Sequence, residues 1–130
     1  MNPISRQDFA EIVRRAAQRD TSYDPNGWSD ENPLWGHCAV VSLLAQDYFG
    51  GSLVRGSLAH LPEYAHLKSH YWNKFPNGEE IDFTKEQYKK AIFTDLTHED
   101  RMRDSVLDHP DTAKRYDLLK NRFNQLLSKT

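Results

Sequence analysis

A stripe of hydrophobic residues at helical spacing runs along the first twenty positions. The stripe comprises Phe9, Ile12, Val13, Ala16 and Ala17. Intervals of three and four residues place these side chains on one face of a helix. Ser5 precedes the stripe and Asp8 comes three positions after Ser5, which is typical of a capped helix start. We predict an N-terminal helix with one buried face, followed by a turn-rich loop over residues 21–32.

A nearly continuous apolar segment follows this loop. Every residue from 39 to 45 is apolar except Ser42, and the segment continues to a Gly50-Gly51 stop. About a dozen residues before two glycines favour a helix over a strand. We predict a central helix that is apolar nearly all round and therefore buried, with Cys38 in its first turn.

A short strand and a hairpin are predicted next. Residues 52–58 indicate the strand, and residues 61–67 a loop or helical turn. The sequence Phe-Pro-Asn-Gly at 75–78 has the composition of a type I turn followed by a glycine bulge. Such a three-residue loop pairs Phe75 with Glu79 across the hairpin.

This register decides which side chains share a face. It makes His70 and Asp82 diagonal neighbours, about 7 to 8 Å apart at the backbone, and turns Tyr71 and Phe83 toward the core. A two-residue Asn-Gly loop would place His70 and Asp82 on opposite faces. Thr84, three residues before a glutamine, indicates a helical turn after the second strand.

The C-terminal third is predicted to be helical. Thr97 is placed to cap a short helix through Leu107, and Pro110 to end the segment that follows. After Asp111, a second stripe at helical spacing predicts a long helix that packs on the core. Its members are Tyr116, Leu119, Phe123, Leu126 and Leu127.

Composition and charge exclude several classes of protein. The chain has 130 residues, 38% of them hydrophobic, which fits a single domain over residues 1–130. No run approaches the ~18 apolar residues of a membrane span, and the charged N-terminus lacks the apolar core of a secretory signal. A net charge of −2 disfavours nucleic acid as a partner. We expect a cytoplasmic protein without a membrane partner; its oligomeric state does not follow from the sequence.

The single cysteine is the candidate nucleophile. The positive end of a helix dipole stabilises a thiolate at the position predicted for Cys38. His70 could act as the general base and Asp82 could orient its ring, which completes a thiol–imidazole–carboxylate set. Helix, strand, strand is also the order of these groups in papain-like and transglutaminase-like cysteine enzymes. The alternative is an inert buried cysteine, a half-buried histidine and an aspartate that caps a turn.

Two stretches of the chain resemble the YunG-like family of small bacterial proteins. They are NPLWGHCAVVSLLAQDYFGGSLVRG and SHYWNKFPNGEEIDFTKEQY, and the similarity covers about residues 28 to 88. The resemblance implies a papain-like α+β fold, in which a central helix with an N-terminal cysteine packs on a small antiparallel sheet. It also implies that Cys38, His70 and Asp82 occupy the positions of a catalytic triad. The residue before the cysteine is commonly Gln in that family and is His37 here.

Residues next to the predicted triad are candidates for oxyanion or pocket contacts. They are His37, Trp35, Trp72 and Asn32. The tryptophans are equally consistent with core packing. Zinc is the competing chemistry, but the histidines lack the spacing of a metal site, so we expect no metal and no cofactor.

Two classes of function remain open from the sequence. The first is an acyl-transfer enzyme of peptidase, amidase or deamidase type that acts on a peptide, amide or ester through a thioester. The second is a catalytically silent papain-like module with a binding or toxin/immunity role.

Overall fold

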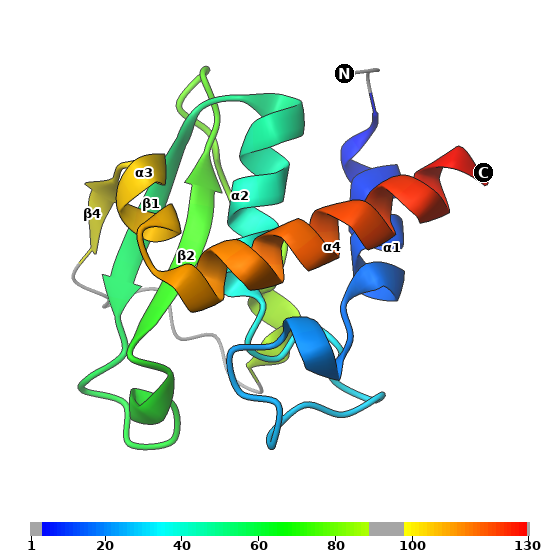
Figure 1. Ribbon diagram of the computed structural model, residues 1–130. Helices are drawn as coiled ribbons and strands as arrows, with labels where there is room; N and C mark the ends of the chain where they lie inside the picture. Colours follow the sequence, from blue (N-terminus) through cyan, green and yellow to red (C-terminus); the bar gives the residue numbers. More distant parts are fainter. Residues whose placement is uncertain (1–3, 89–97, 130) are drawn as a thin grey trace.

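The computed structural model describes residues 4–88 and 98–129 (Figure 1). Its helices are α1 (Arg6–Ala16), α2 (Cys38–Phe49), α3 (Arg103–Leu107) and α4 (Pro110–Ser128). Its strands are β1 (Ser52–Ser57), β2 (Ser69–Lys74), β3 (Glu80–Ile81) and β4 (His98–Arg101). Single 3-10 turns lie at Arg19–Thr21, Ala65–Leu67 and Lys85–Gln87.

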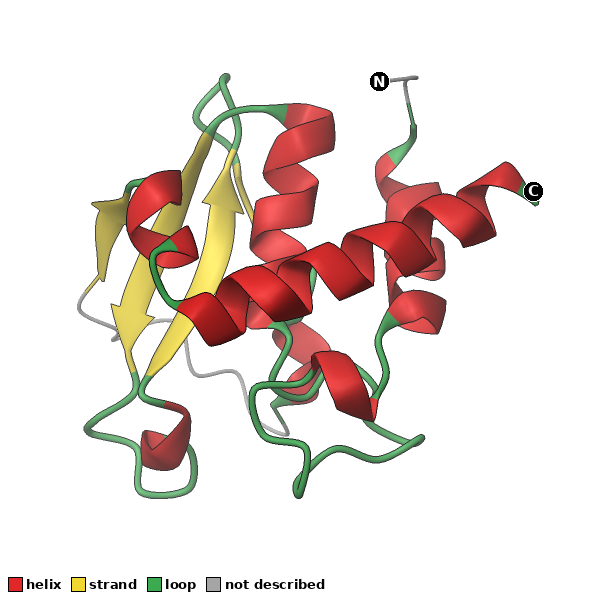
Figure 2. Ribbon diagram, in the orientation of Figure 1, coloured by secondary structure: helices red, strands yellow, loops and turns green. Residues whose placement is uncertain are grey.

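The four strands form one antiparallel sheet in the order β3-β2-β1-β4 (Figure 2). Helix α2 packs on β1 and β2, and α4 crosses from the sheet side of the molecule to α1 (Figure 1). The predicted α+β class is therefore confirmed, with the cysteine-bearing helix packed on a small antiparallel sheet and further helices beside it.

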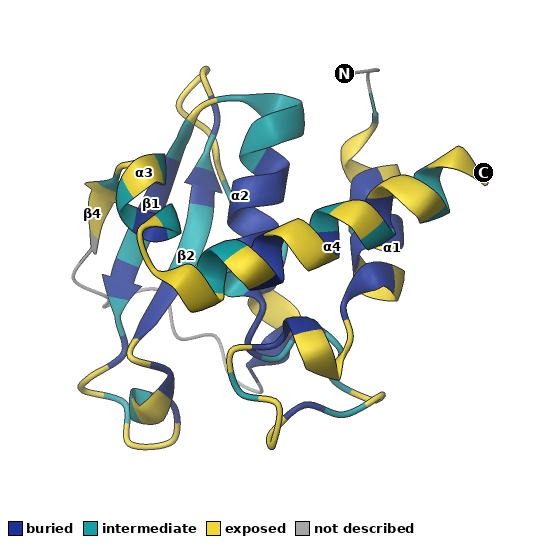
Figure 3. Cartoon of the chain, viewed as in Figure 1, coloured by how far each residue is buried: buried dark blue, intermediate teal, exposed yellow. Residues whose placement is uncertain are grey.

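Helix α2 has no exposed residue, and its residues 40–45 are all buried, as the apolar sequence predicts (Figure 3). It begins at Cys38 and ends at Phe49, and Gly50 terminates it with a φ of 75°. The Asn73 side chain joins the helix to the sheet, because its Nδ2 donates to the Ser42 carbonyl at 2.9 Å. This hydrogen bond satisfies a buried amide that would otherwise be costly.

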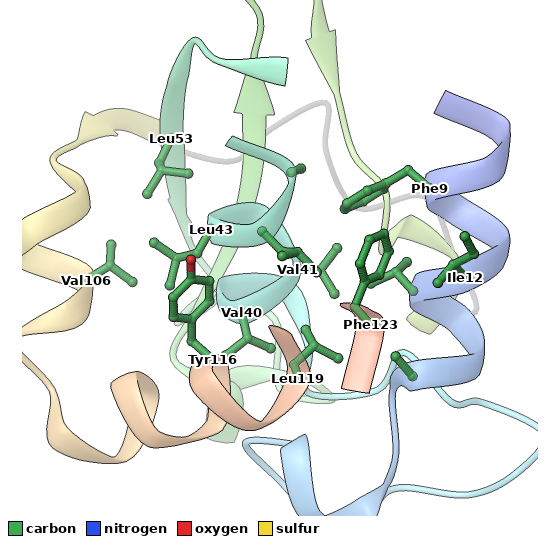
Figure 4. Packing of buried hydrophobic residues seen from close by; sticks show 14 residues of the cluster. Phe9, Ile12, Val40, Val41, Leu43, Leu53, Val106, Tyr116, Leu119 and Phe123 are labelled. Carbon is green, nitrogen blue, oxygen red and sulfur yellow. The ribbon is translucent and has the colours of Figure 1, made fainter. Parts of the chain in front are cut away.

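Helices α1 and α4 cover the side of α2 that faces away from the sheet (Figure 4). The Ser5 hydroxyl accepts a hydrogen bond from the Asp8 N–H at 3.0 Å, which confirms the predicted cap of α1. Phe9 of α1 and Phe123 of α4 are both fully buried, with ring centroids 5.3 Å apart. Both predicted hydrophobic stripes therefore meet in one core.

The hairpin has the predicted bulged turn. The Phe75 N–H donates to the Glu79 carbonyl at 2.8 Å, and Asn73 pairs with Ile81 in the ladder. Gly78 takes the left-handed conformation at φ 89°, which a three-residue loop with a glycine bulge requires. Phe83 packs against the main core, as the predicted register demands.

The segment before α4 differs from the prediction. Thr97 lies outside the described residues, and residues 98–101 form the edge strand β4, so α3 begins only at Arg103. An edge strand of charged residues has no hydrophobic alternation by which to detect it. Pro110 is the first residue of α4 and does not end the preceding segment. The first N–H of a helix has no acceptor within the helix, so a proline, which lacks an N–H, is favourable there.

We predict unequal effects of alanine at two glycines with positive φ. A Cβ at Gly51 would overlap the Lys74 carbonyl oxygen and lie 2.9 Å from the Phe75 Cα, whereas a Cβ at Gly78 meets nothing within 4 Å. Gly78→Ala should cost about 1 kcal/mol of backbone strain. Gly51→Ala should lower the free energy of unfolding by at least about 2 kcal/mol more, since the backbone must shift. Urea denaturation measures both, and equal losses would contradict the packing of Gly51 against the hairpin.

Candidate active site

Cys38 occupies the first position of α2, as predicted from the sequence. Its side chain is partly accessible, and its Sγ donates a weak hydrogen bond to the Ser69 carbonyl, at 3.8 Å. The first N–H groups of a helix have no partner within the helix, and the dipole there favours negative charge. Cys38 therefore lies at the end of α2 where the backbone N–H groups and the positive end of the dipole are found.

His70 and Asp82 lie against each other, as the predicted register requires. The His70 Nε2 and the Asp82 Oδ2 are 2.6 Å apart. The His70 side chain is 0% exposed and that of Asp82 is 14% exposed. The other carboxylate oxygen of Asp82 accepts from the N–H and the hydroxyl of Thr84, at 3.0 and 3.2 Å. Asp82 is thereby held in position toward the ring.

The second ring nitrogen of His70 faces the Tyr88 hydroxyl, at 2.9 Å. A carboxylate only accepts, so the Nε2 toward Asp82 carries the ring proton. The Nδ1 is then the atom that gains or loses a proton. Trp72 stacks on the ring at a centroid distance of 5.6 Å, so the imidazole is fixed on its face as well as at both nitrogens.

The surroundings favour the charged form of His70. Burial of the ring lowers its pKa, but hydrogen bonds with Asp82 and Cys38 outweigh that penalty and raise the pKa from 6.5 to about 9. Burial also raises the pKa of Tyr88, and the negative charges that Cys38 and Asp82 can carry raise it further. Tyr88 therefore stays a neutral hydroxyl beside the imidazole. Cys38, His70 and Asp82 thus form one interacting set.

His37 does not direct its side chain to this set. Its Nε2 is 2.6 Å from the Thr21 hydroxyl and its Nδ1 is 2.9 Å from the Trp35 carbonyl. The ring is fully buried. Burial lowers the pKa of His37 to about 4, against the opposing effect of the bond to the Trp35 carbonyl. It is a neutral ring that holds the turn before Cys38.

Asn32 also acts on the backbone. Its Nδ2 donates to the Gln87 carbonyl at 3.0 Å, and the Gln87 Oε1 in turn accepts from the Gly36 N–H at 3.0 Å. The Gln87 Nε2 donates to the Thr84 hydroxyl. These bonds tie the segment after Asp82 to the turn before Cys38.

The two tryptophans pack beside the cluster that contains Tyr88. Trp35 donates to the Asp24 carboxylate at 3.0 Å, and Trp72 donates to Glu80 at 2.7 Å. Both pack against a second small hydrophobic cluster, which consists of Leu58, Tyr64, Leu67 and Tyr88. The hydrogen bond from Trp35 lowers the pKa of Asp24.

A cavity of about 350 Å³ opens beside Cys38. Ser69, Tyr71 and Gln87 contribute to its wall, and His70 lies behind the wall. His37, Trp35, Trp72 and Asn32 do not line this cavity, although the sequence suggested them as pocket residues. Of the predicted site residues, Cys38 alone borders it.

Tyr88 and Gln87 are the site residues that the sequence analysis missed. The signal for Gln87 was the Thr84 spacing, which predicted a turn but not the bond to Gly36. No local pattern marks Tyr88, since its contact with His70 depends on how the chain returns after the hairpin.

Two negative findings concern the described residues alone. None of their helices combines the length and hydropathy that crossing a membrane requires. Over the same ranges, no group of three or more His, Cys, Asp or Glu side chains could hold a metal ion.

Comparison with known proteins identifies a family and a relative. The model of the YunG protein family matches residues 5–128. YunG of Bacillus subtilis (strain 168), described as an uncharacterized protein, is 34% identical over 81 residues. That match covers 62% of this chain and 61% of the length of the relative. No solved structure matches the chain.

We predict that His37 limits stability in mild acid. Its pKa is about 4 in the folded protein and near 6.5 unfolded, so its contribution is complete above pH 6.5 and is lost as the pH falls toward 4. The loss is on the order of 3 kcal/mol, at ~1.4 kcal/mol per pKa unit. His37→Gln removes the titrating ring. The difference in free energy of unfolding between the wild type and His37→Gln should therefore decrease by that amount between pH 7 and pH 4.

Urea titrations at several pH values measure this gap. The exposed His60 provides the matched control, and His60→Gln should change the pH dependence little. His70 does not interfere, because both proteins contain it and its raised pKa affects the stability of both between about pH 6.5 and 9. A constant gap between wild type and His37→Gln would refute the assignment.

Proposed function

This chain belongs to the YunG protein family, and we propose that it is a cysteine-dependent acyl-transfer enzyme of peptidase, amidase or deamidase type. Cys38 is the nucleophile, His70 the general acid and base, and Asp82 the group that orients His70. The observation that carries the proposal is the 2.6 Å hydrogen bond between His70 and Asp82 beside a cysteine at a helix N-terminus. A carboxylate that fixes the imidazole in this way is what a thiol nucleophile needs for repeated proton transfer.

The first half-reaction forms a thioester. In the reactive form the Cys38 proton already resides on the His70 Nδ1, as a thiolate–imidazolium pair, and the thiolate attacks the substrate carbonyl carbon to form a C–S bond. When the tetrahedral intermediate collapses, the C–N or C–O bond breaks, and His70 gives its proton to the leaving amine or alcohol. The raised pKa of His70, about 9, keeps the imidazolium available as this acid near neutral pH.

The second half-reaction restores the enzyme. His70 takes a proton from water, the resulting hydroxide attacks the thioester carbonyl, and the C–S bond breaks to release a carboxylic acid. The thiolate that leaves is again paired with the imidazolium. Throughout, Asp82 accepts from the Nε2 and does not need to change its own protonation state.

The oxyanion contact is assigned to the backbone. The Cys38 N–H lies in the first turn of α2, where no helical partner occupies it. We assign no such contact to the His37 side chain, because both ring nitrogens are engaged with Thr21 and Trp35. Our proposal also includes a papain-like arrangement, supported by a cysteine-bearing helix packed on an antiparallel sheet that supplies the histidine.

A catalytically silent binding or toxin/immunity-type module is the second candidate. One observation favours it: the residue directly before the cysteine is a buried, neutral histidine that offers no side-chain donor to an oxyanion. Such a module has no use for a reactive thiolate, so thiol reactivity separates the two candidates.

We predict that His70 activates Cys38 toward iodoacetamide. With His70→Ala the imidazolium is lost, and the pH of half-maximal alkylation should move upward. At pH 7 an ordinary thiol is only about 3% thiolate, so the rate there should fall roughly tenfold or more. Asp82→Asn should give a smaller shift in the same direction. The rates are measured by quenching the reaction at set times and determining the alkylated fraction by mass spectrometry. Cys38 is the single cysteine that can react.

The control variant is His60→Ala, which removes an exposed histidine and should leave the alkylation profile unchanged. A profile that neither His70→Ala nor Asp82→Asn displaces would mean that the three residues do not act together. The binding-module candidate would then replace the enzyme.

A further inference from the structure

The cavity beside Cys38 is lined by an excess of positive charge. Its cationic residues are Arg55, Lys68, Arg101 and Arg115, and its single carboxylate among the described lining residues is Asp111. Four cations against one carboxylate leave a clear imbalance in a space of about 350 Å³. Because the whole chain has a net charge of −2, this concentration is local and not a property of the surface.

The sheet register brings two of these arginines together. Leu53 pairs with Arg101 and Arg55 pairs with Glu99, so Arg55 and Arg101 are diagonal neighbours on one face of β1 and β4. Glu99 compensates them in part, at 3.0 Å from Arg101 and 3.8 Å from Arg55. Its side chain is 61% exposed, so solvent weakens these two ion pairs.

Arg101 retains an unused donor. Its Nε is buried and has no hydrogen-bond partner among the residues that the structure describes. A buried donor without a partner is costly and uncommon in native proteins. Arg101 therefore lines the cavity with a guanidinium whose hydrogen-bonding capacity is not fully used, and a guanidinium can bind a carboxylate through two parallel N–H groups.

Arg115 also lines the cavity. Its side chain is only 7% exposed and is held by Asp111 at 2.9 Å and by the Thr21 carbonyl at 3.2 Å. The first turn of the 19-residue helix α4 lies here too, through His109 and Thr112, and the first turn of α2 contributes Cys38 and Ala39. Two helix N-termini therefore add their positive ends to the same space.

We propose that this cavity binds a carboxylate of the substrate, so that the substrate class is a small amide or peptide with a carboxylate next to its scissile bond. This inference rests on the proposed function for the scissile bond and on the cavity for the carboxylate. The volume is at the small end of ligand sites, which span roughly 300 to 1,000 Å³. It suits a single amino-acid-sized group.

Two alkylating agents of similar size test the charge preference at Cys38. Iodoacetate is an anion and iodoacetamide is neutral. The ratio of the iodoacetate rate to the iodoacetamide rate on Cys38, divided by the same ratio on N-acetylcysteinamide, measures the preference of the cavity for an anion. We expect this relative ratio to be about 10 at low salt, and to fall toward 1 as salt screens the charges. In Arg101→Gln and in Arg55→Gln it should drop severalfold. Arg15→Gln, which removes an exposed arginine that does not line the cavity, should leave it unchanged.

A binding measurement keeps the test independent of thiol chemistry. Calorimetry with N-acetyl-L-alanine and with N-acetyl-L-alaninamide should show at least tenfold tighter binding of the acid, reduced in Arg101→Gln. Equal binding of acid and amide, or a relative alkylation ratio near one, would overturn the proposal. Inorganic phosphate that binds as tightly as the acid would overturn the assignment to a carboxylate.

The two proposals fail in different ways. A cysteine that is indifferent to His70→Ala refutes the enzyme, yet the acid would still bind in preference to the amide if the cavity is an anion site. Conversely, an activated cysteine without charge preference leaves the enzyme in place and removes the carboxylate from its substrate.

Discussion

Burial of α2 on nearly every side is the constraint on which the rest of the structure depends. An apolar helix cannot be left with one face in water, so the sheet must cover one side and α1 with α4 the other. The sheet, α2 and the pair of α1 with α4 therefore form three successive layers, and the N-terminus of α2 lies beside the sheet. A cysteine at that point sits at the edge of the core, next to the start of β2, and His70 follows from the strand that packs on the helix.

The sequence predicts the parts of this fold that local patterns encode. The helical stripes predicted α1 and α4, and the two glycines predicted the end of α2. The turn residues up to Gly78 predicted the register that brings His70 to Asp82. What it could not predict depends on contacts between distant segments. Strand β4 has charged residues and only one neighbour, so it lacks a hydrophobic pattern, and the contact of Tyr88 with His70 arises only after the chain folds back.

The same distinction applies to the chemistry. The sequence motif predicts where Cys38 lies. The burial of His37 and its two hydrogen bonds arise only in the packed turn. Its position next to Cys38 in the sequence therefore suggested an oxyanion role that its side chain does not have in the structure. The positive cavity is likewise invisible in the net charge of −2, because its arginines come from β1, β4 and α4. Only the antiparallel register of β1 and β4 makes Arg55 and Arg101 neighbours.

The bond between Gln87 and Gly36 has a consequence for dynamics. It is a buried hydrogen bond between the Gln87 side chain, in the 3-10 turn at Lys85–Gln87, and the backbone of the turn before Cys38. If the segment around Gln87 opens, the Gly36 amide loses its acceptor and the turn in front of Cys38 loses its support, so both loops should behave as one cooperative unit of local unfolding. Opening of this unit would withdraw Tyr88 from the His70 ring while α2 and the sheet stay folded. Assembly of the site is then an equilibrium of its own, distinct from folding of the chain.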